Sequence, residues 1–205
     1  MGLSSLVSPI VVLGILIAAF PKALHLATRK EYVTHEKGAI LITGASTGIG
    51  RHAVETLAKE GKWVVYAGVR KSADAQELNG LKIPNLRPIL LDMSDDKSIT
   101  TAHAKVTSEL NKEGLPFVGL VNNAGLSTNS PLEFTPINKL RSLMEVNVIG
   151  AARLTQLFIP QLRETKGRVV QMSSVLGKLY FPTRTAYCAS KRALEVSPSW
   201  PYCTP

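Results

Sequence analysis

The 205-residue chain is 45% hydrophobic and 19% charged, which excludes a disordered chain and allows one α/β domain with a short appendage. Its two cysteines, Cys188 and Cys203, exclude a disulfide framework, and its four histidines lack the spacing of metal ligands. The net charge of +9 comes from scattered basic residues with few aromatics beside them, so we expect neither a metal site nor a nucleic-acid surface.

The N-terminal segment from Leu3 to Phe20 contains no charged residue. As a helix rising about 1.5 Å per residue it would extend about 27 Å, close to the roughly 30 Å hydrocarbon core of a bilayer. The flank that follows is net basic, with Lys22, Arg29, Lys30 and Lys37 against Glu31 and Glu36. We therefore predict a membrane anchor and basic linker over residues 1–37, inserted through residues 3–20. We expect the anchor to lie in the endoplasmic reticulum membrane, with the large C-terminal part facing the cytosol. A cleaved signal peptide and a helix buried against another chain remain the alternatives.

Short apolar runs alternate with helical patterns from Gly38 onward. Strands are predicted over residues 39–43, 63–68, 86–91, 117–121 and 168–173. Helices are predicted over 48–60, 95–111 and 137–163, the last bent at Pro160. Near-continuous apolar strands separated by helices indicate a doubly wound parallel sheet of the Rossmann-like α/β class. This domain is expected over 38–197, and an irregular proline-rich tail over 198–205.

The stretch TGASTGIG, from Thr43 to Gly50, joins the first predicted strand to the first predicted helix. Its glycines let the backbone approach a pyrophosphate at the helix N-terminus, where unpaired amides and the helix dipole favour negative charge. The spacing is G-x-x-x-G-x-G rather than the commoner G-x-G-x-x-G. A simple tight turn is the alternative interpretation.

Four further motifs follow in order: Asn122-Asn-Ala-Gly125, Asn147 in EVNVIG, Ser173-Ser174, and Tyr187-Cys-Ala-Ser-Lys191. Together with TGASTGIG they resemble the short-chain dehydrogenase/reductase family over residues 38–196. The segments YCASK and YAGVR are similar to hydroxysteroid and retinol dehydrogenases, more weakly. The resemblance implies an NAD(P)-dependent oxidoreductase that interconverts an alcohol and a carbonyl by hydride transfer.

The catalytic residues implied by the resemblance are Asn147, Ser174, Tyr187 and Lys191. Tyr187 and Lys191 are spaced i and i+4, so one helix face presents both. A phenol ordinarily releases its proton near pH 10, and a neighbouring ammonium favours the phenolate. Tyr187 is therefore expected to be the general acid/base, assisted by Lys191. By resemblance, Ser174 bonds the substrate oxygen and Asn147 supports a water-linked proton path to the lysine.

The cofactor residues are expected around the carboxyl ends of the strands. They are Gly44, Ser46, Thr47, Gly48, Ile49, Gly50, Arg70, Asp92, Asn123, Ala124, Gly125, Tyr187 and Lys191. Asp92 matches the family's acidic residue beside the adenine, and its alternative role is to cap the next helix. The segment YAGVRK offers Arg70 and Lys71 and no carboxylate for a ribose hydroxyl, which favours NADP and leaves NAD open.

Beyond Lys191 the sequence departs from the family pattern, because RALEVSPSWPYCTP leads to the last residue without the family's later strands and substrate-covering loop. We expect a truncated form whose fifth strand is an exposed edge. The first hypothesis is an NADP-linked enzyme acting on an apolar steroid-, retinoid- or lipid-like substrate. The second is a non-catalytic nucleotide-binding or interaction module. The third is a membrane-tethered partner of a full-length relative. A homo-oligomer is left open.

Overall fold

The computed structural model describes residue 20 and residues 34–195, and the compact unit that carries the motifs begins at His35. The anchor predicted over residues 3–20 lies outside the described residues apart from Phe20, and so does the tail predicted over 198–205. None of the helices within the described part is both long enough and apolar enough to cross a bilayer.

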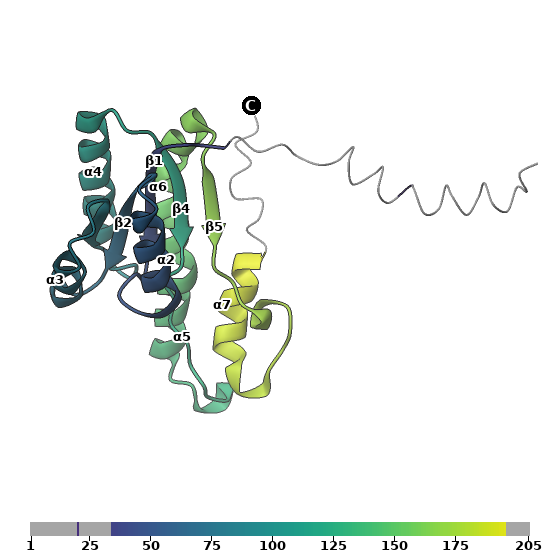
Figure 1. Cartoon of the computed structure of the whole chain (residues 1–205). Helices are drawn as coiled ribbons and strands as arrows, with labels where there is room; N and C mark the ends of the chain where they lie inside the picture. The colour runs from purple at the N-terminus through teal and green to yellow at the C-terminus, as the bar shows by residue number, and fades with distance from the viewer. Residues whose placement is uncertain (1–19, 21–33, 196–205) are drawn as a thin grey trace, which may run out of the picture. The chain divides into compact units, whose positions relative to one another are not determined.

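Within the described residues, five parallel strands form a single sheet in the order β3-β2-β1-β4-β5 (Figure 1). The strands are β1 (Gly38–Thr43), β2 (Trp63–Val69), β3 (Leu86–Leu90), β4 (Phe117–Asn122) and β5 (Arg168–Gln171). The order reverses between β1 and β4, so the loops that leave their carboxyl ends diverge and open a crevice there. The predicted Rossmann-like parallel sheet is thus present.

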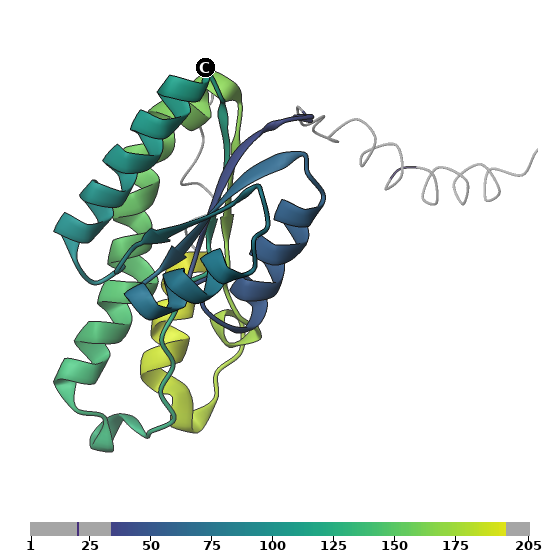
Figure 2. The ribbon, with the colours of Figure 1, turned by 60° about the vertical axis from the view of Figure 1, so that its left-hand side comes forward.

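Helices cover both faces of the sheet (Figure 2). They are α2 (Gly48–Lys59), α3 (Ser72–Gly80), α4 (Asp96–Glu113), α5 (Ile137–Met144), α6 (Ala151–Thr165) and α7 (Thr185–Glu195). Buried residues of α4 and α6 pack on one face and those of α2 and α3 on the other. Helix α7 packs against α5 and the π-helical segment η2 (Glu145–Gly150), and short 3-10 turns η1 (Leu132–Phe134), η3 (Val175–Gly177) and η4 (Pro182–Arg184) complete the loops.

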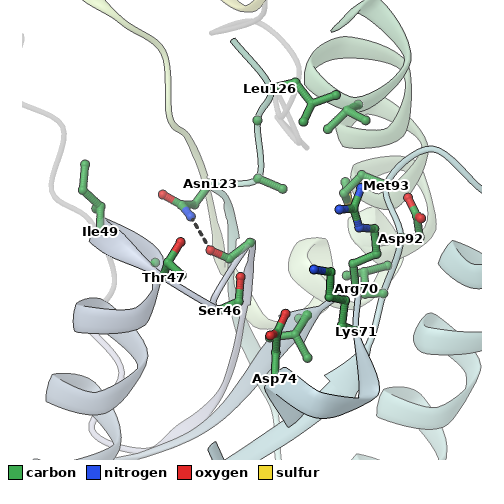
Figure 3. A pocket seen from close by; sticks show the side chains of 18 residues that line it. Ser46, Thr47, Ile49, Arg70, Lys71, Asp74, Asp92, Met93, Asn123 and Leu126 are labelled. Carbon is green, nitrogen blue, oxygen red and sulfur yellow. Dashed lines mark hydrogen bonds between the residues drawn. The ribbon is translucent and has the colours of Figure 1, made fainter. Parts of the chain in front are cut away.

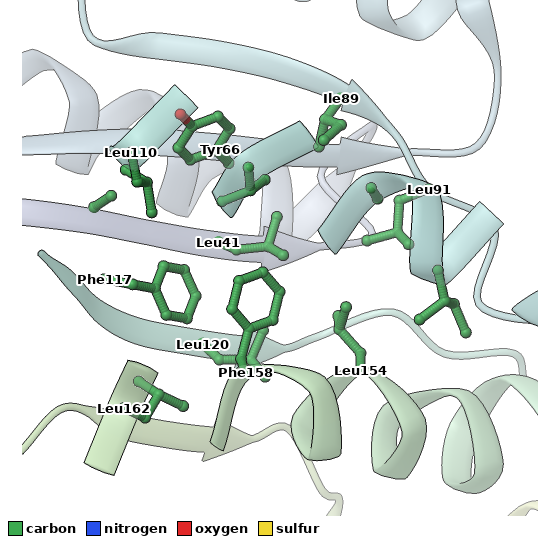
Figure 4. Packing of buried hydrophobic residues seen from close by; sticks show 14 of the residues in the cluster. Leu41, Tyr66, Ile89, Leu91, Leu110, Phe117, Leu120, Leu154, Phe158 and Leu162 are labelled. Atoms are coloured by element: carbon green, nitrogen blue, oxygen red, sulfur yellow. The ribbon is translucent and has the colours of Figure 1, made fainter. Parts of the chain in front are cut away.

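The larger half of the core lies between the sheet and helices α4 and α6 (Figure 4). Phe117 of β4 stacks on Phe158 of α6 with ring centroids 4.2 Å apart, and Leu41 and Leu120 complete the layer over the central strands. These side chains are almost fully buried. Such burial contributes roughly 1.5–3 kcal/mol for each large apolar side chain, which fixes α6 across β4 and so positions the segment before it.

The helix predicted over 137–163 forms as α5 and α6 joined by the π-helical segment η2, an irregularity that was not predicted. Helix α6 continues through Pro160, which is exposed, and the departure from α geometry lies in η2, before α6 begins. Gly150, at the end of η2, lies so close to the Met93 carbonyl oxygen that a Cβ there would overlap it. The close approach to the loop after β3, rather than the proline, accompanies the change in helical geometry.

Candidate active site

The glycine turn between β1 and α2 adopts the conformation that its sequence predicts. Gly44 and Gly48 have φ values of +66° and +58°, in the left-handed region that side chains disfavour. Gly50 has no room for a side chain, because a Cβ would overlap the Gly44 carbonyl oxygen. Thr47 stands at the N-cap of α2 without a side-chain capping bond. The first amides of this helix are therefore available to an anion.

Hydrogen bonds join this turn to the segment that follows β4. The buried Thr43 hydroxyl oxygen accepts from the backbone amides of Asn123, at 3.0 Å, and Ala124, at 2.9 Å. The Asn123 side-chain amide donates to the carbonyl oxygen of Thr43 at 2.9 Å and to that of Gly44 at 3.1 Å, the second of which Figure 3 shows as a dashed line. Two motifs about 80 residues apart in the sequence thus form one edge of a crevice.

A cavity of about 510 Å³ opens at this edge, at the carboxyl ends of β1, β2 and β4. Most of the predicted cofactor residues line it: Gly44, Ser46, Thr47, Ile49, Gly50, Arg70, Asp92, Asn123, Ala124 and Gly125. Gly48, Tyr187 and Lys191 were also predicted and are not among its lining residues. A volume of this size is in the range of small-molecule and cofactor sites.

At one end of the cavity, Asp92 and Arg70 lie near each other (Figure 3). Burial acts to raise the pKa of the Asp92 carboxyl, but hydrogen bonds from the Ser94 hydroxyl and amide, helped by the charge of Arg70, bring that pKa below its ordinary value. The alternative role of Asp92 as a helix cap is wrong. Asp95 caps α4 instead, accepting from the amides of Lys97 and Ser98.

Asn147 lies in the π-helical segment η2 and is almost completely buried. Its side chain binds the backbone of Leu126 twice, accepting from the amide at 2.7 Å and donating to the carbonyl at 2.9 Å. It also donates to the hydroxyl of Ser190 at 2.9 Å. The change from α to π geometry thus coincides with an asparagine that connects α7 to the loop after β4.

Lys191 and Tyr187 share one side of α7, as their spacing predicts. The Lys191 ammonium lies 5.8 Å from the centre of the Tyr187 ring and donates to the Met172 carbonyl oxygen at 2.6 Å. The side chain is buried, and burial lowers the pKa of the Lys191 ammonium below its ordinary value. A lysine held in this way is a fixed positive charge beside a half-buried phenol.

Asn147 and Lys191 approach the cavity at Gly125. A Cβ at Gly125 would lie 3.4 Å from the Asn147 side-chain oxygen and 3.5 Å from the Lys191 ammonium nitrogen. Gly125 itself lines the cavity. The structure therefore brings two of the four predicted catalytic residues to the rim of the predicted cofactor site.

Ser174 follows β5 and is half-buried, at the N-cap of η3, where its hydroxyl oxygen accepts from the Leu176 amide at 3.2 Å. The turn η3 packs against α7, and the Arg192 guanidinium donates to the Gly177 carbonyl at 3.0 Å. This packing fixes the segment that carries Ser174 against the helix that carries Tyr187.

Several residues of the site were not predicted from the sequence. The additional lining residues are Gly68, Val69, Lys71, Asp74, Leu91, Met93, Leu126 and Val146. The positioning residues Thr43 and Ser190 act through hydrogen bonds to Asn123, Ala124 and Asn147. Thr43 and Ser190 stand inside the motifs TGASTGIG and YCASK, Gly68 and Val69 inside YAGVR, and Lys71 next to Arg70, so the sequence carried a signal for these five without assigning them a role. The remaining residues come together through the strand order, which no local motif encodes.

The cavity fits a dinucleotide. The glycine turn excludes Cβ atoms where a pyrophosphate would approach, the N-terminus of α2 presents amides, and Arg70 and Lys71 add positive charge. Residues 38–196 match the family model described as short chain dehydrogenase. The chain belongs to the short-chain dehydrogenase family. The motif-based prediction is confirmed, and members of this family bind NAD(P).

Curated short-chain dehydrogenases show the same similarity. Mitochondrial D-beta-hydroxybutyrate dehydrogenase of Mus musculus is 36% identical over 184 residues, which cover 86% of this chain and 53% of the relative. The 17-beta-hydroxysteroid dehydrogenase type 1 of Homo sapiens is 39% identical over 165 residues, which cover 76% of this chain and 48% of the relative. The chain spans about half the length of the curated relatives it matches.

Solved structures of the family share the fold. A short-chain dehydrogenase from Streptomyces avermitilis superimposes with a TM-score of 0.73 at 35% identity, over 82% of this chain and 60% of that one. A short-chain dehydrogenase from Burkholderia cenocepacia, determined in complex with NADP, superimposes with a TM-score of 0.69 at 28% identity. The match covers 80% of this chain and 65% of that one. The sheet and its helices are thus those of the family.

Proposed function

We propose that this chain is an NADP-linked oxidoreductase that interconverts an alcohol and a carbonyl on an apolar substrate. The observation that carries the proposal is the meeting of Asn147 and Lys191 around Gly125, at the rim of the dinucleotide-shaped cavity. Lys191 is buried next to a tyrosine and a cofactor cleft and forms no ion pair within the described residues, a position that a purely structural lysine does not require. Such perturbed groups cluster where chemistry takes place.

In the proposed reaction each of these residues has a separate role. A bound nicotinamide supplies or accepts the hydride. Tyr187 exchanges the proton on the substrate oxygen, and Ser174 donates a hydrogen bond to that oxygen. Lys191 places its charge beside Tyr187 while its bond to Met172 fixes the ammonium. Asn147 holds η2 and α7 at the distance that this arrangement requires.

Arg70 supports the choice of NADP. It is exposed, lines the cavity and follows β2, where an NAD-dependent relative would carry an acid for the ribose hydroxyl. Arg70→Ala should weaken NADP binding by about 1–3 kcal/mol, the cost of a charge-assisted contact, and change NAD binding far less. Isothermal titration of NADP and of NAD measures the two affinities. Equal losses of affinity for NADP and NAD in Arg70→Ala would reject the preference for NADP.

The segment between Ser174 and Tyr187 supports an apolar substrate. It exposes four apolar side chains, and Tyr180 is the most exposed at 72%; the others are Val175, Leu179 and Phe181. Its far end is fixed to the loop after β4, since Thr183 donates to Asn129 and Arg184 to Ser127, both at 2.9 Å. An anchored segment with several exposed apolar groups next to the reacting residues suits an apolar ligand.

The function is tested with Tyr187→Phe, which removes the proton-exchanging hydroxyl and keeps the ring. Turnover of a panel of apolar alcohols and ketones should fall 10²–10⁴-fold or more, while NADP affinity stays nearly unchanged. Tyr66→Phe is the matched control, because Tyr66 lies in the core beside α4. Activity that survives Tyr187→Phe would overturn the mechanism.

A nucleotide-binding module without turnover is the second candidate. Within the described residues β5 pairs only with β4, and Val170 of β5 remains 46% exposed. An edge strand with an exposed apolar residue is a surface that another chain can cover, which suits a module that binds a nucleotide and a partner. Tight NADP binding without turnover of any substrate in the panel would favour this candidate over the enzyme.

A further inference from the structure

Two oppositely charged side chains line the cavity near the start of α3. Lys71 is the N-cap of α3, and Asp74 lies in its first turn. Both line the cavity together with Ser46 of the glycine turn. In Figure 3 the side chains of Ser46, Lys71 and Asp74 lie at the same end of the cavity, while Arg70 extends toward Met93 and Asp92.

Neither charge has a partner in the part of the chain that the structure describes. The ion pairs and side-chain hydrogen bonds of that part do not include Lys71 or Asp74. Arg70, by contrast, already interacts electrostatically with Asp92. Within the described residues, neither Lys71 nor Asp74 is therefore committed to an ion pair, and both charges are available to a ligand in the cavity.

The balance of charges at this end does not suit a phosphate alone. A phosphomonoester carries about −1.5 to −2 at neutral pH, whereas a ribose hydroxyl is neutral and can donate a hydrogen bond. Arg70 and Lys71 attract the phosphomonoester, and Asp74 repels it. Asp74 could also serve only to stabilise the N-terminus of α3, which acids in the first turn do by about 0.3–1 kcal/mol. That role, however, does not require the half-buried side chain to line the cavity.

We propose that Asp74 determines cofactor specificity by opposing a 2′-phosphate and accepting from a ribose hydroxyl, so that the preference for NADP over NAD is narrow. Lys71 supplies the opposing attraction, as a cavity-lining cation that forms no ion pair within the described residues. The inference rests on the proposed NADP-linked function, and it adds that the site is built to admit both nucleotides.

Binding of 2′,5′-ADP and 5′-AMP to the full chain, measured by isothermal titration, tests the proposal without turnover. Asp74→Asn should tighten 2′,5′-ADP about three- to tenfold, since a like charge is removed from a partly exposed site. The same change should leave 5′-AMP unchanged or weaken it. Lys71→Gln should weaken 2′,5′-ADP about tenfold, and both shifts should shrink as salt is raised.

Two variants control for charge and for folding. Asp74→Glu keeps the charge and should keep the wild-type ratio of the two affinities. Glu60→Gln removes one negative charge from the exposed C-cap of α2 and should change neither ligand. Equal shifts for both ligands in Asp74→Asn, or none, would overturn the proposal. Failure of the NADP assignment would show differently, as an Arg70→Ala variant with an unchanged 2′,5′-ADP affinity.

Discussion

Gly50 has no room for a side chain, because a Cβ would overlap the Gly44 carbonyl oxygen and the Asn123 side-chain amide. Gly50→Ala must therefore displace the turn, which should cost about 1–3 kcal/mol of unfolding free energy. NADP affinity should fall at least tenfold, since the turn shapes the cavity. Urea unfolding and nucleotide titration measure the two effects.

Gly80 provides the control for that substitution. It ends α3, and a Cβ there would meet nothing within 4 Å. Gly80→Ala should leave nucleotide binding unchanged and raise the unfolding free energy by up to about 1 kcal/mol, because alanine favours helix. Equal effects of the two substitutions would contradict the role assigned to Gly50.

Ser190 is the buried link between the asparagine and the tyrosine helix. Its hydroxyl accepts from Asn147 and donates to the Tyr187 carbonyl oxygen at 2.8 Å. Ser190→Ala should lower kcat about tenfold with little change in KM for the nucleotide, as losing a buried hydrogen bond costs about 1–2 kcal/mol. Ser142→Ala, on the exposed side of α5, is the control. A lower melting temperature with unchanged kcat would make Ser190 merely structural.

At the scale of elements, a polar cluster joins β2, β3 and α4. The Tyr66 hydroxyl donates to Glu109 at 2.9 Å and accepts from Arg87 at 3.2 Å, while Arg87 also binds Glu113 through both terminal nitrogens. Burial is the main reason that the pKa of Tyr66 rises to about 12, and the Arg87 hydrogen bond opposes that rise. The neutral phenol is thus the form that the folded chain favours.

The raised pKa of Tyr66 makes the stability of the folded chain fall as the pH rises in the alkaline range. The folded pKa lies above the value near 10 of an unfolded chain, so the contribution of Tyr66 to stability is complete below about pH 10. It is lost as the pH rises from about 10 to about 12. An ultraviolet titration of phenolate should show a component near pH 12 that Tyr66→Phe removes and Tyr180→Phe keeps. A component that persists in Tyr66→Phe would show that another tyrosine causes it.

The sequence predicts the strands to within two residues, because each is a nearly continuous apolar run of a buried parallel sheet. It does not predict α3, whose residues Ser72–Gly80 bury only Leu78 and so show no clear helical period. It does not predict the cap of α4 either, because the pattern makes Asp95, which caps the helix, its first residue and leaves only Asp92 as a candidate cap. Pro88 is tolerated in β3 because that strand lies at the edge of the sheet.

At the scale of the whole molecule, the site is assembled from segments that meet only after the sheet has formed. Asn147 reaches Ser190 across 43 residues, and Thr43 reaches Asn123 across 80. The motifs identified which residues matter because each is a short local pattern. They did not show that Lys71 and Asp74 share a cavity with Ser46, since that depends on the register of β1 and β2.

The last prediction concerns the uncharged segment of residues 3–20, which lies mostly outside the described residues and is argued from its sequence. Its length and basic flank favour insertion with residues 38–205 facing the cytosol. Carbonate-washed membranes should retain the chain, and added protease should digest the domain without detergent. Leu13→Lys with Leu16→Lys should release it, because a lysine near the middle of a bilayer costs about 2.5–3.5 kcal/mol. Leu13→Ile with Leu16→Ile is the matched control and should stay bound. Recovery of the unaltered chain in the wash, or protection of its domain from protease, would reject this topology.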